Sequence, residues 1–537
     1  MTVKSGLATP LADHGIHKIA SPTAVDPSET AATARARVEQ AQPPADPDVL
    51  TIGRRTAQGA VVTTIATAAA FVLRTGSMIT LARLVVPRDF GLVGMVTAFT
   101  GFLALLRDGG LSMAAIQRSS VTDDQTSTLF WINLAVGAAL AGLCAAAGPV
   151  LARFYGEPRL PAIALFIGLG FLFNSAGIQH RALLQRAMRF RILAAIDTAS
   201  LMLSIVIVIA MAAAGAGYWA VAMMTVALPA LSTAFAWGIT RWVPGAPRRR
   251  TGVRAMLWYG GSVTLNNIIV YIAYNTDKVL LGRFWGAEAL GIYGRAYQLI
   301  NIPNENLNSC VGLVAFPALS RMQHDPARLR QYFLKGYGFF QCLILPIACS
   351  CLLFADDIVR VFLGPKWSAA AGIFRLLAPT VVAFALVNPL AWFMFAAGRT
   401  RISLKISSLI VPIVVGAYSL GLRAGPQGVA FGFSAAMTLL VVPITWLAIR
   451  DTAIALRDIV QVVMHPMMSI IAAAAVVMVL GGWTHQVEPA LLRLAVDSSM
   501  LFGIYAFVLL WVLDQKSEYA ATLRQAGLWP VGWGLKG

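Results

Sequence analysis

Long apolar stretches alternate with short polar connections along most of the chain. A helix that crosses a bilayer needs about 20 mostly apolar residues, and fourteen stretches approach or exceed that length. They cover approximately residues 57–82, 89–106, 125–152, 160–180, 192–214, 217–240, 256–282, 287–316, 332–355, 369–397, 402–422, 426–449, 462–483 and 491–513. The pattern predicts an all-α integral membrane protein with about fourteen transmembrane helices. An even number of spans places both chain ends on the same side.

Lysines and arginines favour every second connection between these stretches. The even-numbered connections carry more than twice as many as the odd-numbered ones. Because positive charge gathers in cytoplasmic loops, the distribution predicts that both chain ends are cytoplasmic. Residues 1–53 are rich in proline and lack an apolar run of signal-peptide length, which predicts a disordered cytoplasmic tail and not a cleaved signal. Residues 516–537 form the second cytoplasmic tail.

The sequence resembles itself at an offset of 200 residues. Residues 79–94 read ITLARLVVPRDFGLVG, and residues 279–294 read VLLGRFWGAEALGIYG. The identical pairs are Leu81 and Leu281, Arg83 and Arg283, Gly91 and Gly291, and Gly94 and Gly294. Chance similarity between apolar segments is the alternative, but it does not readily align an arginine and two glycines at one inter-helix turn. Spans 1 and 2 therefore resemble spans 7 and 8.

Six spans separate the two copies, so both have the same orientation in the membrane. In transporters built from parallel repeats, the two halves are related by an axis along the membrane normal. The repeat predicts two six-helix lobes, residues 54–250 and residues 251–450. Two further helices follow in residues 451–515.

Composition agrees with this architecture and narrows the chemistry. Hydrophobic residues make up 58% of the 537 residues and charged residues 12%, against about 45–50% and 25% in soluble domains. The net charge of +18 lies in small groups between apolar stretches, so we expect membrane topology and no nucleic-acid partner. The five cysteines lack CxxC spacing, and there is no GxxxxGK[ST], HExxH or GxSxG motif. We expect no metal site, no cofactor and no enzymatic activity.

A charged side chain near the bilayer centre costs roughly 2.5–3.5 kcal/mol and needs a cavity, a partner or a route to the interface. Arg74 lies well inside span 1, on one helical face with Thr63 and Thr67. Its position indicates a functional role, with structural pairing as the alternative.

Span 7 carries a polar stripe of Asn267, Tyr271, Tyr274 and Lys278, with Asp277 beside the lysine. The spacing places the four stripe residues on one helical face. A wet cavity wall and a seam between two helices both fit the pattern. Asp277 and Lys278 also lie close enough to the outer end of the span to be partly solvated.

Span 8 is the most polar stretch. Its polar residues are Arg295, Tyr297, Gln298, Asn301, Asn304, Glu305, Asn306 and Asn308. Pro303 removes one backbone donor and is expected to kink the helix among these amides. Because broken helices at membrane depth line cavities, span 8 predicts a water-filled central cavity.

Four further polar positions are weaker candidates. Asn174 and Arg181 lie seven residues apart in span 4, but Arg181 also begins a cytoplasmic loop. Asp197 lies one turn into span 5 and can pair with that loop. Arg375 in span 10 can extend toward the outer interface.

Several segments resemble the bacterial polysaccharide-export flippases, the Wzx and WzxC-like branch of the superfamily that contains multidrug extruders and the lipid II flippase. The resemblance spans about residues 54–450. The matching segments are ARLVVPRDFGLVGM from residue 82, DGGLSMAAIQR to residue 118, FYGEPRL at 154–160, LLQRAMRF at 183–190, NTDKVLLGRFWGAEALGIYGRAYQL at 275–299, FPALSRMQHDPARLRQYF at 316–333, and GPKW at 364–367.

The resemblance implies an inner-membrane carrier that moves an undecaprenyl-diphosphate-linked oligosaccharide from the cytoplasmic to the periplasmic leaflet. Relatives in the superfamily place arginines of the first and eighth spans in a central cavity, and Arg74 and Arg295 occupy those spans here. Our hypothesis is alternating access, in which Arg74, Arg295 and Lys278 hold the diphosphate.

The same hypothesis assigns roles to the other polar residues of spans 7 and 8. Asn301 and Asn304 belong to the amide-rich substrate site. Glu305 or Asp277 couples transport to protons. Besides the lipid-linked substrate and membrane lipids, the family implies a polysaccharide polymerase and a chain-length regulator as partners.

Two other functions are weighed against the flippase. A cation-coupled multidrug extruder of the same superfamily would favour acidic residues in the cavity, whereas the deepest charges here are mainly basic. A membrane polysaccharide polymerase or acyltransferase would show a large periplasmic loop or a clustered His/Asp pair, and neither is visible.

Overall fold

The computed structural model describes residues 47–107, 122–247, 254–322, 325–484 and 488–516. The chain divides into two units, Met1–Val61 and Val62–Gly537, and the packing described here is that of the second unit. Most of both predicted tails, and the side chains of Thr63 and Asn267, lie outside the described part of the chain.

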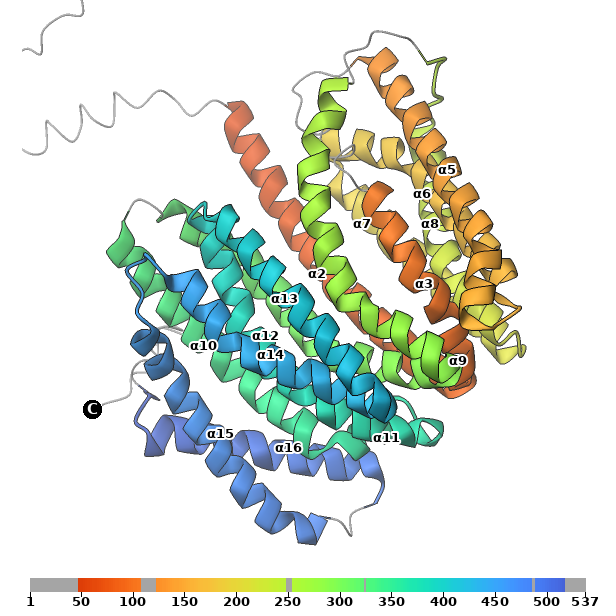
Figure 1. The fold of residues 1–537 in the computed structure, drawn as a ribbon. Helices are drawn as coiled ribbons and strands as arrows, with labels where there is room; N and C mark the ends of the chain where they lie inside the picture. The colour runs from red at the N-terminus through yellow and green to blue at the C-terminus, as the bar shows by residue number, and fades with distance from the viewer. Residues whose placement is uncertain (1–46, 108–121, 248–253, 323–324, 485–487, 517–537) are drawn as a thin grey trace, which may run out of the picture. The chain divides into compact units, whose positions relative to one another are not determined.

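The described residues form helices and no strands (Figure 1). The long helices are α2 (Pro47–Leu84), α3 (Pro87–Arg107), α5 (Asp123–Tyr155), α6 (Leu160–Arg186), α7 (Phe190–Ala213), α8 (Tyr218–Thr240), α9 (Arg254–Arg321), α10 (Pro326–Leu353), α12 (Ser368–Ala396), α13 (Thr400–Gly421), α14 (Gly425–Ile449), α15 (Leu456–Thr484) and α16 (Ala490–Phe507). The shorter ones are α11 (Ala355–Phe362), η1 (Pro365–Trp367), η2 (Leu422–Ala424) and η3 (Val508–Val512).

All fourteen apolar stretches are helical over nearly their whole length, which confirms the all-α prediction. Helix α9 contains two of them, and Gly286 separates the two because its φ of 80° and ψ of −176° break helical geometry. Ten segments of the described chain are long and apolar enough to cross a membrane. Helices α2 and α9, which carry many of the polar residues discussed below, are not among the ten. The fourteen-span topology therefore stays a prediction.

The helices of the second unit pack in two sequence-ordered groups joined by α3 and α9. In the first group α6 contacts α5 and α8, and α7 contacts α8. In the second, α12 contacts α9, α10 and α14, and α13 contacts α14. Helix α3 packs along α9. Figure 1 shows α5, α6 and α8 side by side, and α12, α13 and α14 likewise.

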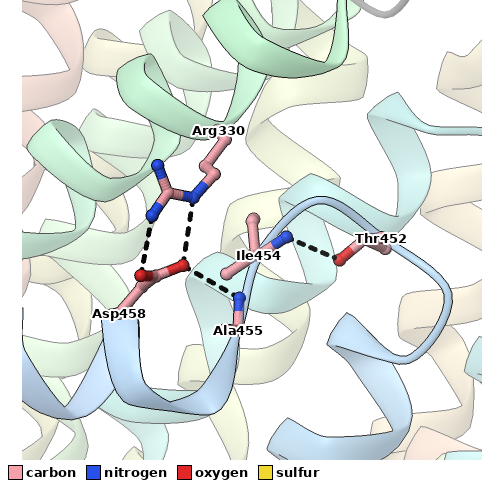
Figure 2. Close-up of polar contacts among 5 residues, drawn as sticks. All are labelled: Arg330, Thr452, Ile454, Ala455 and Asp458. Atoms are coloured by element: carbon pink, nitrogen blue, oxygen red, sulfur yellow. Dashed lines mark hydrogen bonds and ion pairs between the residues drawn. The ribbon is translucent and has the colours of Figure 1, made fainter.

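Two arginine–carboxylate pairs attach the last two long helices, α15 and α16, to α10 and α11. Figure 2 shows Arg330 of α10 bound to Asp458 of α15 through two hydrogen bonds, of 3.0 and 2.7 Å. The backbone N–H of Ala455 donates to the same carboxylate. At the other end, Arg493 of α16 donates through Nε to Asp357 of α11 at 2.9 Å, and its Nη2 makes a second contact. Two-point pairs of this kind orient both partners, so α15 and α16 are held to α10 and α11.

The two copies of the sequence repeat touch each other in a reciprocal way. A Cβ on Gly91 would lie 1.6 Å from the carbonyl oxygen of Ala287, and a Cβ on Gly291 would lie 1.9 Å from that of Pro87. These residues are equivalent across the 200-residue offset, so one contact repeats the other with the copies exchanged. An exchange of equivalent contacts is what a twofold axis produces. The contact supports the predicted repeat, whereas the lobe boundaries stay predictions.

Candidate functional site

Polar side chains from six helices face one cavity in the second unit. Its volume is about 1510 Å³, and α2, α3, α6, α7, α8 and α9 all line it. Of the seven residues to which the flippase hypothesis assigns a role, four are in its wall: Arg74, Lys278, Asn301 and Glu305. These four residues come from α2 and α9, two of the six helices that line the cavity.

Arg74 enters the cavity from the C-terminal third of α2. Its side chain is exposed, and among the described residues it has no hydrogen-bond or ion-pair partner. Thr67, two turns earlier on the same face, also lines the cavity. A cation at membrane depth is tolerated where water or an anion can reach it, and the cavity provides that access.

Lys278 reaches the cavity from the first half of α9, and its Nζ contacts an amide and an aromatic ring. Its Nζ donates to Asn275 Oδ1 at 2.7 Å and lies 5.6 Å from the centroid of the Tyr297 ring. The neighbouring carboxylate of Asp277 accepts instead from Tyr293 and from the backbone N–H of Lys278. The amide and the ring orient the ammonium group, which also interacts electrostatically with the carboxylates of Asp277 and Glu305.

Three other predicted site residues lie outside the cavity wall. Arg295 is 8% exposed, stacks with its guanidinium carbon 3.7 Å from the centroid of Phe90, and donates to Gln298. Asp277 is fully buried. Asn304 is 7% exposed and accepts from Asn388 of α12 at 3.4 Å.

The rotation of α9 about its own axis explains why some of its polar residues face the cavity and others do not. Successive residues of an α-helix point about 100° apart, so Lys278 can face the cavity while Asp277 faces protein. In the second half of α9, residues 297–298, 301–302 and 305–306 line the cavity. Asn304 and Asn308 of the same polar stretch are not among the lining residues. Periodicity alone could not choose between the two faces.

The cavity also contains a charged pair that sequence reasoning ranked low. Arg181 of α6 donates to Asp197 of α7 at 2.5 and 3.1 Å, and to the hydroxyl of Ser232 of α8 at 3.0 Å. All three residues line the cavity. The pairing of Asp197 with the start of the span 4 loop was noted from sequence, but its place in the cavity wall depends on how α6, α7 and α8 pack.

The cavity extends to one end of the helices. Arg107 is the last residue of α3, Gln185 lies next to the last residue of α6, and Phe190 begins α7, and all three line it. The charge distribution predicts that these ends are cytoplasmic.

At the opposite ends of the helices, the two repeat copies are packed together. Trp367 donates its indole N–H to the carbonyl of Ala82 at 2.7 Å, and Arg83 donates to the carbonyl of Val361 at 2.9 Å. In the other copy, the guanidinium carbon of Arg283 lies 5.7 Å from the centroid of the Phe154 ring. The ends of spans 1 and 7 thus each pack on a segment from the other half of the chain, and the cavity is covered on that side.

Comparison with known proteins assigns the family. Residues 80–372 match the polysaccharide biosynthesis protein family. The chain belongs to that family. It is 26% identical over 395 residues to the lipopolysaccharide biosynthesis protein WzxC of Escherichia coli (strain K12), covering 72% of this chain and 79% of that protein. It is 29% identical over 330 residues to the teichuronic acid biosynthesis protein TuaB of Bacillus subtilis (strain 168), covering 61% and 68%. The resemblance drawn from the sequence motifs is confirmed.

Solved structures with a similar fold are membrane transporters. The lipid II flippase MurJ in an inward closed conformation superposes with a TM-score of 0.68 at 12% identity, covering 84% of this chain and all of that one. An inward-facing multidrug resistance transporter of the MATE family gives a TM-score of 0.53 at 14% identity, covering 71% and 96%. At these identities the likeness concerns the fold alone.

Proposed function

We propose that this protein is a flippase that moves undecaprenyl-diphosphate-linked oligosaccharide across the bacterial inner membrane for polysaccharide export. The observation that carries the proposal is a polar cavity among membrane helices in which the cationic side chains of Arg74 and Lys278 make no described hydrogen bond to a carboxylate. A diphosphate is an anion that arginine and lysine side chains bind well. The family and the relatives named above support the same cargo class.

Transport proceeds by alternating access between the lobes of residues 54–250 and 251–450. In the present state the cavity reaches the ends predicted to be cytoplasmic, and the packing of Trp367 on Ala82 covers the other side. Substrate enters from the cytoplasmic leaflet, and separation of the repeat copies at the covered end releases it to the opposite leaflet. Both chain ends are cytoplasmic in this scheme.

The remaining predicted residues act at different depths. Asn301 and Glu305 face the cavity and can contact the head group or a coupling proton. Arg295 acts through Gln298, which lines the cavity, and Asp277 through Lys278. Asn304 acts by holding α9 to α12. A polymerase and a chain-length regulator would receive the exported units, and the protein itself performs no covalent chemistry.

The test is the sidedness of the lipid-linked intermediate in cells that lack the protein. A labelling reaction confined to the periplasm measures undecaprenyl-linked sugars before and after complementation. Wild-type protein is expected to restore labelling, and Arg74→Gln is expected to restore little at equal membrane abundance. Arg375→Gln is the matched control, because Arg375 pairs with the exposed Asp356 outside the cavity wall.

Two outcomes would overturn the proposal. Unchanged labelling in the deletion cells, together with increased drug sensitivity, would make the protein a drug extruder with the same fold. Full complementation by the double variant Arg74→Gln, Lys278→Gln would show that the diphosphate is not bound by these two residues in the cavity.

A further inference from the structure

One part of the cavity wall is built by α6, α7 and α8. Unlike the part that carries the cations Arg74 and Lys278, it contains an arginine paired with a carboxylate. Its centre is the Arg181–Asp197 pair, which Ser232 joins. The side chains of Arg181 and Asp197 are 32% and 53% exposed, so both can be reached from the cavity. Asn174 and Gln185 lie on the same face of α6 and also line the cavity.

The pair keeps hydrogen-bonding capacity after its internal contacts are made. A guanidinium has five N–H donors, and the contacts with Asp197 and Ser232 use three of them. A carboxylate has about four lone-pair sites, and Arg181 occupies two. The two-point contact fixes the orientation of both groups. The wall therefore presents fixed donors and fixed acceptors close together.

This wall suits a different ligand from the cations on α2 and α9. A diphosphate only accepts hydrogen bonds, and the carboxylate of Asp197 would repel it. A sugar hydroxyl both donates and accepts, so a neutral, hydroxyl-rich ligand can use the carboxylate, the guanidinium and the two amides together. The volume of about 1510 Å³ exceeds the roughly 300–1,000 Å³ of drug-sized sites, which leaves room for sugars beside a diphosphate.

We propose that the α6–α7–α8 wall, centred on Arg181 and Asp197, is the glycan-binding part of the cavity. It holds the sugars next to the diphosphate of the lipid-linked substrate and makes transport depend on the glycan. This inference rests on the proposed function and extends it, because it separates the site for the sugars from the site for the diphosphate.

The experiment compares two lipids on purified full-length protein in nanodiscs. One is undecaprenyl diphosphate without sugar, and the other is the lipid-linked oligosaccharide extracted from cells lacking the protein. The wild type is expected to bind the oligosaccharide lipid about tenfold more tightly, the effect of one or two well-placed hydrogen bonds. Asp197→Asn is expected to bring the ratio of the two Kd values close to one, while the Kd for the sugar-free lipid stays within about twofold.

A second variant separates glycan binding from a purely structural ion pair. Arg181→Asp combined with Asp197→Arg restores an ion pair between α6 and α7 with the charges exchanged. A structural role predicts that this double variant recovers the wild-type ratio, whereas glycan recognition predicts that the ratio stays near one. Asp356→Asn, which breaks the exposed pair with Arg375 outside the cavity wall, is the control and is expected to keep the wild-type ratio.

Failure of this inference differs from failure of the proposed function. If wild type binds the sugar-free lipid but shows no preference for the oligosaccharide lipid, the glycan wall is refuted and the diphosphate site stands. A wild-type ratio in Asp197→Asn, or equal weakening of both lipids, would also refute it. If wild type binds neither lipid, the proposed function fails and the glycan wall fails with it.

Discussion

The reciprocal contact between the repeat copies predicts what a single added methyl group does to the covered end of the cavity. In Gly291→Ala, the new Cβ would lie 1.9 Å from the carbonyl oxygen of Pro87, which is a backbone atom and cannot rotate away. The packed arrangement must therefore loosen. Gly294→Ala is the matched control, because Gly294 is on the same helix and has nothing within 4 Å of its would-be Cβ.

The magnitude follows from the difference between these two variants. Both gain about 1 kcal/mol of helix propensity when glycine becomes alanine, so that effect cancels. Overpacking a tight contact costs typically 1–3 kcal/mol, and only Gly291→Ala has such a contact. A bias of about 1–3 kcal/mol against the packed state changes its equilibrium by roughly 5–150-fold.

The assay is the rate at which a membrane-impermeant thiol reagent labels Ala82→Cys, in protein whose native cysteines are replaced by alanine. Ala82 is fully buried behind Trp367 at the covered end. Labelling is expected to speed up in Gly291→Ala by a factor in that range, and not in Gly294→Ala. The reciprocal Gly91→Ala, whose Cβ would lie 1.6 Å from Ala287, is expected to match Gly291→Ala. Equal labelling rates in Gly291→Ala and Gly294→Ala would refute the reasoning.

Three further predictions concern other contacts. Trp367→Phe removes the indole donor from the carbonyl of Ala82 near the end of α2, where carbonyls lack helical partners. The change is expected to lower the free energy of unfolding by about 1–3 kcal/mol and with it the thermal unfolding midpoint. An unchanged midpoint would contradict this expectation. Asp458→Asn weakens the attachment of α15, and Asp357→Asn weakens that of α16. The double variant is expected to lose more thermal stability than either single variant. Wild-type stability of the double variant would show that the pairs do not hold these helices in place. Glu305→Gln is expected to flatten the pH dependence of export at unchanged abundance, and a wild-type pH profile rules out Glu305 as the proton-coupling group.

Much of the fold could be read from local patterns. The apolar stretches became helices because a long apolar run in a bilayer must satisfy its backbone internally. The repeat was visible because Gly91 and Gly291 permit the same close approach in both copies, so the same local requirement recurs in the sequence. Arg74 and Lys278 were found because an isolated cation in an apolar span is costly wherever the neighbours are.

The composition of the site depended on tertiary structure. Asp277, Arg295 and Asn304 share a helix with Lys278 and Asn301, yet only the rotation of α9 against its neighbours decides which of them face the cavity. Arg181 and Asp197 form one polar surface only because α6 and α7 pack beside α8.

The helices, the membrane environment and the presence of charge within apolar segments follow from the amino-acid order, because each depends on runs of residues along one chain segment. Which charges meet, and which end of the cavity is covered, follow from the packing of the helices. Those outcomes depend on contacts such as Trp367 with Ala82, between residues far apart in the sequence. No local period encodes such a contact, because it is specified by the packing of two helices and not by either alone.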